Sequence, residues 1–178
     1  MLEPIAPLSL IKEGGYFMLE AIEKYVEDPT RSFGIISAHD NTQSVSTNLD
    51  RNVHLARNAE IAGFEYVWLE GYWQGQNDSR YEESSLFVLA KPGDNQRLFN
   101  FLQKHAKAAK QDGFIFRNEN DDTITLEYTN GESKRIGKYQ ANQMGDVYSR
   151  VAGGQHKGLP FVFASAGVLI KVLSQLTK

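Results

Sequence analysis

Imidazole, carboxylate, amide and hydroxyl side chains gather around three short apolar runs in the first half of the sequence. An imidazole or a carboxylate beside a bound molecule can act as a general acid or base. A guanidinium, together with the free N–H groups at a helix N-terminus, can hold an anion. The candidate catalytic residues are therefore His39, Glu82 and Glu83. The candidate ligand-binding residues are Ser37, Asp40, Asn48, Arg51, Asn52, Glu70, Tyr72 and Trp73.

A strand, a helix and two further strands must position these side chains. The apolar run 33–38 predicts a buried strand, and a helix follows over 47–62. The alternating run 64–70 and the apolar run 84–90 predict two more strands, separated by a loop over 71–81. The first strand, the helix and the second strand predict a neighbouring parallel pair with a right-handed crossover. We expect 84–90 to pair antiparallel with 64–70.

This arrangement gathers the candidate residues at one edge of the sheet. Ligands of open sheets with parallel strands lie outside the carboxyl ends of those strands. Here that edge receives the residues after 33–38 and 64–70 and the residues before 84–90. The helix over 47–62 also begins there and offers unpaired N–H groups.

The helix over 47–62 carries polar residues on a face that is otherwise apolar. Thr47 followed by Asp50 resembles a capping box at its start. At 100° per residue, Asn52 falls near the middle of the apolar face, Asn48 lies within it, and Arg51 is at its margin. Burying an amide without a partner costs about 1–3 kcal/mol, so the asparagines must bond the backbone, a carboxylate or a ligand. The apolar face consists of Leu49, Val53, Leu55, Ala56, Ala59 and Ala62.

The remaining sequence predicts further strands and packing helices. We assign the fold class α+β: one domain over 1–178, with an N-terminal arm over 1–13 and a mixed β-sheet. The βαβ unit at 33–70 is followed by antiparallel strands. The predicted helices outside that unit are 16–27, 94–111, 138–152 and 167–176. The predicted strands are 114–117, 123–128, 133–137 and 160–164, with Asn130-Gly131 as a hairpin turn.

Composition limits the class of protein. Hydrophobic residues make up 41% and charged residues 23% of the chain, as in ordinary globular proteins. The absence of cysteine excludes disulfides and thiolate zinc sites, and no histidine pair has metal-ligand spacing, so we expect no metal and no cofactor. We find neither a signal-peptide pattern nor 18 consecutive apolar residues. We therefore expect no membrane association and a cytoplasmic location, in the host cytoplasm if the chain is viral.

A spaced set of residues also carries a family resemblance. The set consists of Ile36-Ser37-Ala38, Asn48-x-x-Arg51-Asn52-x-x-Leu55, Gly63-Phe64, Gly71 and Glu82-Glu83-Ser84. Over about residues 33–90 the sequence resembles a family of small uncharacterised bacterial and bacteriophage proteins, catalogued as a domain of unknown function. The resemblance implies an α/β-type core and a bacteriophage origin, and it implies nothing about mechanism.

Three functions are compatible with these observations, and the sequence alone leaves open whether the chain is an enzyme. The interpretation we favour is a phage-type accessory protein that binds a host or viral protein through loop aromatics such as Tyr72, Trp73 and Tyr81, because aromatic residues are enriched in interface hot spots. The second is a hydrolase or transferase acting on a nucleotide or a phosphorylated small molecule. There Arg51 would hold the anion and Glu82 or Glu83 would act as the base.

The third function is weak nucleic-acid binding through the basic second half of the chain. Residues 1–90 carry 6 Lys/Arg and 14 Asp/Glu, a balance of −8, and residues 91–178 carry 13 and 8, a balance of +5, which together give the net charge of −3. Such a charge distribution permits contact with phosphates. We consider scattered surface charge the simpler explanation, so a nucleic-acid partner is not favoured.

Overall fold

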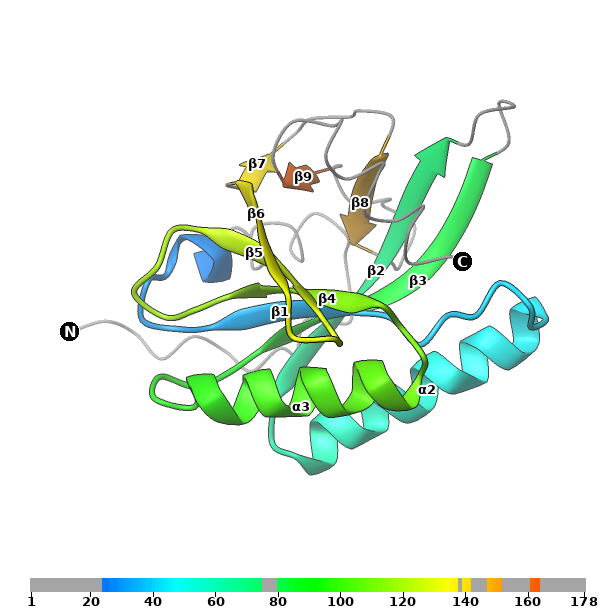
Figure 1. Cartoon of the computed structure of the whole chain (residues 1–178), viewed down its shortest axis with the longest axis horizontal. Helices are drawn as coiled ribbons and strands as arrows, with labels where there is room; N and C mark the ends of the chain where they lie inside the picture. The colour runs from blue at the N-terminus through cyan, green and yellow to red at the C-terminus, as the bar shows by residue number, and fades with distance from the viewer. Residues whose placement is uncertain (1–23, 75–79, 138, 142–146, 152–160, 164–178) are drawn as a thin grey trace.

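A sheet of nine strands forms the centre of the described part of the chain, in the order β6-β5-β4-β1-β3-β2-β8-β9-β7 (Figure 1). The structure is a computed structural model that describes residues 24–74, 80–137, 139–141, 147–151 and 161–163. The helices are α2 (Val45–Ile61) and α3 (Asn95–Ala108). The strands are β1 (Phe33–Ile36), β2 (Glu65–Gln74), β3 (Arg80–Leu89), β4 (Gly113–Arg117), β5 (Ile124–Tyr128), β6 (Ser133–Gly137), β7 (Tyr139–Ala141), β8 (Val147–Val151) and β9 (Phe161–Phe163).

Four strands and two helices make up the middle of the fold. They follow one another as β1-α2-β2-β3-α3-β4 along the chain and lie as β4-β1-β3-β2 in the sheet. This is the split βαβ, or ferredoxin-like, arrangement. The strands β2 and β3 form a hairpin paired from Glu65↔Leu89 to Gln74↔Arg80, and β3 also pairs with β1 from Phe33↔Leu89 to Ile36↔Leu86.

The α+β class is therefore confirmed, but the mixed sheet with neighbouring parallel strands is wrong. The strands β1 and β2 run in the same direction, as the crossover requires, because each pairs antiparallel with β3. The hairpin return after β2 places β3 between them, and every strand pair in the described part of the chain is antiparallel. The end of β1 consequently lies beside the middle of β3, where Ile36 pairs with Leu86.

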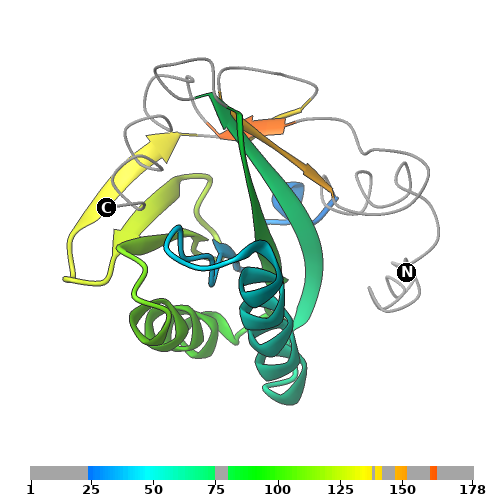
Figure 2. The same cartoon turned by 90° about the vertical axis from the view of Figure 1, so that its right-hand side faces the viewer.

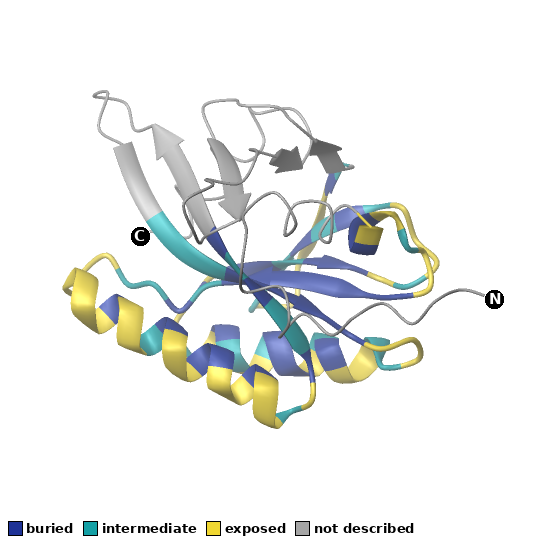
Figure 3. Cartoon of the chain, turned by 180° about the vertical axis from the view of Figure 1, so that it is seen from behind, coloured by how far each residue is buried: buried dark blue, intermediate teal, exposed yellow. Residues whose placement is uncertain are grey.

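Both helices cover the same face of the sheet (Figures 1 and 2). Their buried sides are directed toward the strands, and their exposed sides toward solvent (Figure 3). The core between the layers includes Leu55, Ala59, Leu98 and Leu102 from the helices, and the rings of Phe64 and Phe101 pack edge to face at 5.2 Å. No helix in the described residues is long and apolar enough to cross a bilayer.

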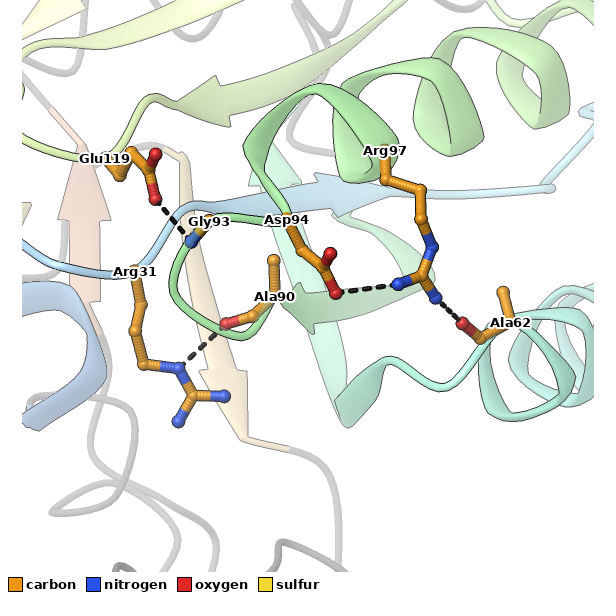
Figure 4. Close-up of polar contacts among 7 residues, drawn as sticks. All are labelled: Arg31, Ala62, Ala90, Gly93, Asp94, Arg97 and Glu119. Carbon is orange, nitrogen blue, oxygen red and sulfur yellow. Dashed lines mark hydrogen bonds and ion pairs between the residues drawn. The ribbon is translucent and has the colours of Figure 1, made fainter.

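The two helices are antiparallel, and an arginine from each binds the C-terminal end of the other. Arg97, in the first turn of α3, is held by Asp94 (Nη1–Oδ2, 2.7 Å) and donates to the carbonyl of Ala62 at the end of α2 (Figure 4). Arg51 of α2 donates from Nη2 to the carbonyl of Ala109 at the end of α3 (3.0 Å). The last carbonyls of a helix lack partners within it and carry partial negative charge. Each arginine therefore both satisfies a helix end and fixes the helix pair.

Several element boundaries differ from the sequence-based expectations. The helix α2 begins after Ser44, whose Oγ accepts from the Thr47 N–H (3.1 Å), so Thr47 is not its first residue. The predicted loop 71–81 is largely strand, because β2 and β3 extend into a long hairpin. The predicted helix 138–152 is wrong, since β7 and β8 lie there. Pairing of β8 with β2 supplies partners for the backbone groups of β2 that would otherwise form an open edge.

The other predicted elements are confirmed or lie outside the described residues. The helix α3, the strands β4, β5, β6 and β9, and the Asn130-Gly131 turn match their predicted positions. The arm over 1–13, the helix over 167–176 and most of the helix over 16–27 lie outside the described part of the chain.

Close packing of α3 on β1 generates the first prediction. A Cβ atom added at Gly34 would overlap Leu102 Cδ1 and lie 2.9 Å from the Ile115 carbonyl oxygen. We expect Gly34→Ala to lower the free energy of unfolding by about 3 kcal/mol, the upper range for overpacked cores. The control is Gly93→Ala, where nothing lies within 4 Å but φ is +86°, so backbone strain alone should cost about 1 kcal/mol. Urea denaturation of both variants measures this, and a Gly34→Ala cost no larger than that of Gly93→Ala would contradict it.

Candidate functional site

The backbone of residues 38–40, here called the 38–40 segment, leaves β1 and joins no other strand. All six of its N–H and C=O groups are nevertheless hydrogen-bonded to side chains. Ala38 N–H donates to Asn52 Oδ1 (2.9 Å), His39 N–H to Ser37 Oγ (3.0 Å) and Asp40 N–H to Asn48 Oδ1 (2.8 Å). The carbonyls of Ala38, His39 and Asp40 accept from Arg51 Nε (2.6 Å), Gln111 Nε2 (2.5 Å) and Asn48 Nδ2 (2.9 Å).

Three of these side chains come from one face of α2. Asn48, Arg51 and Asn52 are spaced three and four residues apart, so they project toward the same neighbour. Asn52 is fully buried, and its Nδ2 donates to the Asn48 carbonyl (3.2 Å). The interpretation of Asn52 as a paired buried amide is thus confirmed, and its partners are backbone groups. Arg51 donates to the backbone carbonyls of Ala38 and Ala109. In this structure it therefore binds backbone groups and not the anion that the sequence analysis had expected it to hold in an enzyme.

Gln111 is the member of this network that the sequence analysis missed. It is 8% exposed and follows Lys110, which has the left-handed backbone conformation (φ 58°) after α3. Its contact with His39 spans 72 residues of sequence. No local pattern marks such a long-range partner, whereas the asparagines are revealed by the periodicity of their own helix.

Beside the 38–40 segment is a pocket of about 250 Å³. It brings together four of the predicted residues: His39, Asn48, Asn52 and Glu83. Ser37 lies next to it and donates to the Ser84 carbonyl (2.8 Å). Among the residues that the structure describes, the lining consists of His39, Val45, Asn48, Leu49, Asn52, Glu83 and Ser84.

Asp40 and Arg51 are described by the structure and do not line this pocket. The Asp40 carboxylate accepts from the backbone and hydroxyl of Thr42 (2.9 and 2.6 Å). These hydrogen bonds hold the pKa of Asp40 below its usual range. The side chains of Glu70, Tyr72, Trp73 and Glu82 lie outside the described residues.

Val45 and Leu49 of α2 form the apolar outer wall of the pocket. The sequence analysis had placed Leu49 on the buried face of this helix. Leu49 and Val53 were expected on the buried face, but they are 54% and 48% exposed, and Val45 is 87% exposed. The buried face is instead centred on Asn48, Asn52, Ala56 and their neighbours. The helix is rotated in this way because its amides must reach the 38–40 segment.

Glu83 and His39 are the groups in the pocket that can exchange protons. Burial raises the pKa of the Glu83 carboxyl, while a hydrogen bond with Ser37 and the positive charge of His39 act in the opposite direction. The His39 Nε2 lies 3.5 Å from Asn48 Nδ2. The other bonds of Asn48 orient this amide so that its NH₂ faces the ring, and Nε2 accepts in that contact when the imidazole is neutral. A carboxyl and an imidazole in one small pocket can carry out acid–base chemistry.

Among the described residues, no three His, Asp or Glu side chains gather in a way that could hold a metal ion. The described lining of the pocket offers hydrogen bonds, the Glu83 carboxyl group and an apolar wall to a ligand.

The comparisons with known proteins identify the family. A family model described as the S-adenosylmethionine lyase family matches residues 34–156, which is 156 − 34 + 1 = 123 of the 178 residues. The chain belongs to the S-adenosylmethionine lyase family. The comparison with curated proteins yields no match. The expected membership in a domain family of unknown function is thereby corrected, and the match extends well beyond residue 90, where the resemblance ended.

The role of Asn52 leads to a test of the network. Replacing Asn52 with Leu leaves the Ala38 N–H without its partner and removes the side-chain bond to the Asn48 carbonyl, so we expect the free energy of unfolding to fall by about 1–3 kcal/mol. Asn58 lies on the same helix and is exposed, so Asn58→Leu should change it by no more than about 0.5 kcal/mol. Urea melts of the two variants measure the difference. Equal stabilities would show that the amide does not support the 38–40 segment.

The raised pKa of Glu83 predicts a particular pH dependence of stability. The folded protein binds this proton more tightly than the unfolded chain, whose carboxyl titrates near 4.5. Stability should therefore decrease as the pH rises from 4.5 through the folded-state pKa. Glu83→Gln removes this titration, so its stability curve should be flatter and should lie at or above that of the parent at higher pH. Chemical denaturation at a series of pH values measures the free energy of unfolding of the parent, of Glu83→Gln and of the exposed control Glu60→Gln. If the free energy of unfolding of Glu83→Gln varied with pH in parallel with that of the parent, the prediction would be wrong.

Proposed function

We propose that this protein is an enzyme that cleaves a carbon–sulfur bond of S-adenosylmethionine without adding water. The observation that carries the proposal is the family match over residues 34–156, which includes the described residues that line the pocket. A lyase is the class given by the family description, in place of the hydrolase or transferase considered from the sequence. This substrate contains a nucleoside but no phosphate, so it differs from the nucleotide or phosphorylated molecule considered from the sequence.

The chemistry of the substrate fits a site made of side chains alone. Sulfur in S-adenosylmethionine carries a positive charge, so the electron pair of the broken carbon–sulfur bond stays on sulfur and a neutral thioether leaves. Such a leaving group needs no further activation. The carbon that loses sulfur is completed without water, either by loss of a neighbouring proton to a base with formation of a double bond or by attack of the substrate's own carboxylate. The reaction removes charge from sulfur, which a pocket with an apolar wall favours over water.

The pocket is large enough to hold only part of the substrate. Sites for small molecules usually enclose about 300–1,000 Å³, and this pocket is about 250 Å³. We propose that the 38–40 segment, Asn48, Asn52 and Glu83 surround the reacting part of the substrate. The hydrogen-bonded backbone would hold His39 in a fixed position there, as an active site requires.

Incubation of the purified protein with S-adenosylmethionine tests the proposal. We expect loss of the sulfonium compound and formation of a neutral thioether, measured by liquid chromatography and mass spectrometry without any methyl acceptor. In water labelled with oxygen-18 the first products should carry no label, because a lyase adds no water. Glu83→Gln should lower the rate by about 100-fold, within the range for an acid–base group.

The control variant is Glu60→Gln. Glu60 lies on the same helix as Asn48 but 12 residues away, a distance of about 18 Å along the axis, so this variant should keep the parental rate. Intact substrate after prolonged incubation with the parent protein would contradict the proposal. So would accumulation of S-adenosylhomocysteine, which would indicate methyl transfer.

A further inference from the structure

Gln111 holds the 38–40 segment from a different helix than the other side chains that bind it. Four of the six bonds to the segment come from α2, and one comes from Ser37, which adjoins the segment. The sixth comes from Gln111, which follows α3 and lies 72 residues from His39 in the sequence. The end of α3 is thereby connected to the middle residue of the segment.

The backbone of Gln111 is itself fixed by the way in which α3 ends. Lys110 has a positive φ of 58°. The Gln111 N–H donates to the Ala106 carbonyl (2.9 Å), and the Lys110 N–H donates to the Lys107 carbonyl (3.1 Å). These two backbone bonds define a Schellman motif. The Gln111 carbonyl also accepts from the Thr129 hydroxyl (3.2 Å). The buried side chain of Gln111 therefore extends from backbone that is held on both sides.

The bond from Gln111 restrains the peptide group between His39 and Asp40. One end of this group, the His39 carbonyl, accepts from Gln111 Nε2 (2.5 Å). The other end, the Asp40 N–H, donates to Asn48 Oδ1 (2.8 Å). A trans peptide group is planar, so its N–H and C=O rotate together as one unit. Bonds at both ends prevent that rotation, and without Gln111 one of the two would remain.

The orientation of the Asn48 amide depends on the same peptide group. Asn48 accepts from the Asp40 N–H and donates from Nδ2 to the Asp40 carbonyl (2.9 Å), and its Nδ2 lies 3.5 Å from His39 Nε2. When the imidazole is neutral, this contact favours the tautomer with the proton on Nδ1, because Nε2 must accept. Gln111 thus acts on a ring that lines the pocket, although it does not line the pocket itself.

We infer that Gln111 is a positioning residue of this site: from the end of α3 it fixes the His39–Asp40 peptide group and thereby keeps the Asn48 amide against the His39 ring. The effect on turnover rests on the proposed function, whereas the effect on the ring does not. Because Gln111 lies outside the pocket, its loss should affect the chemical step more than the binding of substrate. Misplacing a group that takes part in a reaction can lower the rate by about 100-fold.

Gln111→Met tests this inference, because methionine has a similar length and lacks the amide that donates to the His39 carbonyl. The Schellman bonds use backbone groups, so they remain in this variant. In a second variant, Gln111→Glu, a carboxyl oxygen replaces the donor while the shape is kept, and this variant carries the same test if methionine prevents folding. The matched control is Gln103→Met. Gln103 is a half-buried glutamine of α3 whose Nε2 donates to the Thr129 carbonyl (3.4 Å), and it supplies none of the six bonds to the 38–40 segment.

The first measurement is nitrogen-15 NMR of the histidine rings, which shows the nitrogen that carries the proton; His39→Gln identifies the His39 signal. At about pH 8.5, about two units above the usual His pKa, the parent and Gln103→Met should show His39 as the Nδ1–H tautomer. Both Gln111 variants should show a mixture of the two tautomers, because the ring loses its contact with Asn48. An unchanged His39 signal in both variants would overturn the inference.

The second measurement is the rate of cleavage of S-adenosylmethionine. We expect kcat of Gln111→Met to fall about 10- to 100-fold, while KM stays within about threefold of the parental value. Gln103→Met should keep both parental values. An equal fall of kcat in the two variants would show a merely structural role and would overturn the inference.

The two measurements also separate the inference from the proposed function. Cleavage of S-adenosylmethionine by the parent, together with an unchanged His39 tautomer in the Gln111 variants, would refute the inference alone. A changed tautomer in those variants, with the substrate left intact by the parent, would refute the proposed function and would confirm that Gln111 positions the ring.

Discussion

The structure depends on satisfying six backbone groups that no strand can reach. The 38–40 segment leaves the sheet just after Ile36, which pairs with Leu86 part-way along β3. Its N–H and C=O groups would each be costly to bury unpaired. Side chains from α2, from Ser37 and from Gln111 bond all of them. This requirement sets the rotation of α2, which directs Asn48 and Asn52 inward and leaves Leu49 and Val53 exposed. The apolar wall of the pocket follows from that rotation.

The same network connects the site to the packing of the helices. Arg51 donates to Ala38 in the 38–40 segment and to Ala109 at the end of α3, and Arg97 makes the reciprocal contact with the end of α2. Gln111, directly after α3, holds the His39 carbonyl. The position of the pocket is thus determined by both helices, and a substrate can bind against backbone that is already ordered, which reduces the entropic cost of binding.

The sequence predicted the site from a polar residue on an otherwise apolar helix face. It did not predict the features that depend on pairing between distant segments of the chain. Asn52 stood out because an amide on an apolar helix face demands a partner, and its partner is the backbone after β1. The insertion of β3 between β1 and β2 was missed because a crossover pattern does not show whether a later hairpin strand will separate the pair. The helix predicted over 138–152 is wrong because tertiary pairing of β8 with β2 overrides a weak local pattern. The expected host or viral protein partner and the weak nucleic-acid contact stay predictions, and the family indicates an enzyme.

The 38–40 segment is held by its six hydrogen bonds whether or not a ligand is bound. A crystal structure of the protein with an unreactive analogue of S-adenosylmethionine, beside one without it, tests this most directly. We predict that the ligand lies in the pocket beside the 38–40 segment and that the backbone of this segment and its six hydrogen bonds are the same in both structures. A ligand bound elsewhere, or a 38–40 segment that becomes ordered only in the complex, would contradict the account.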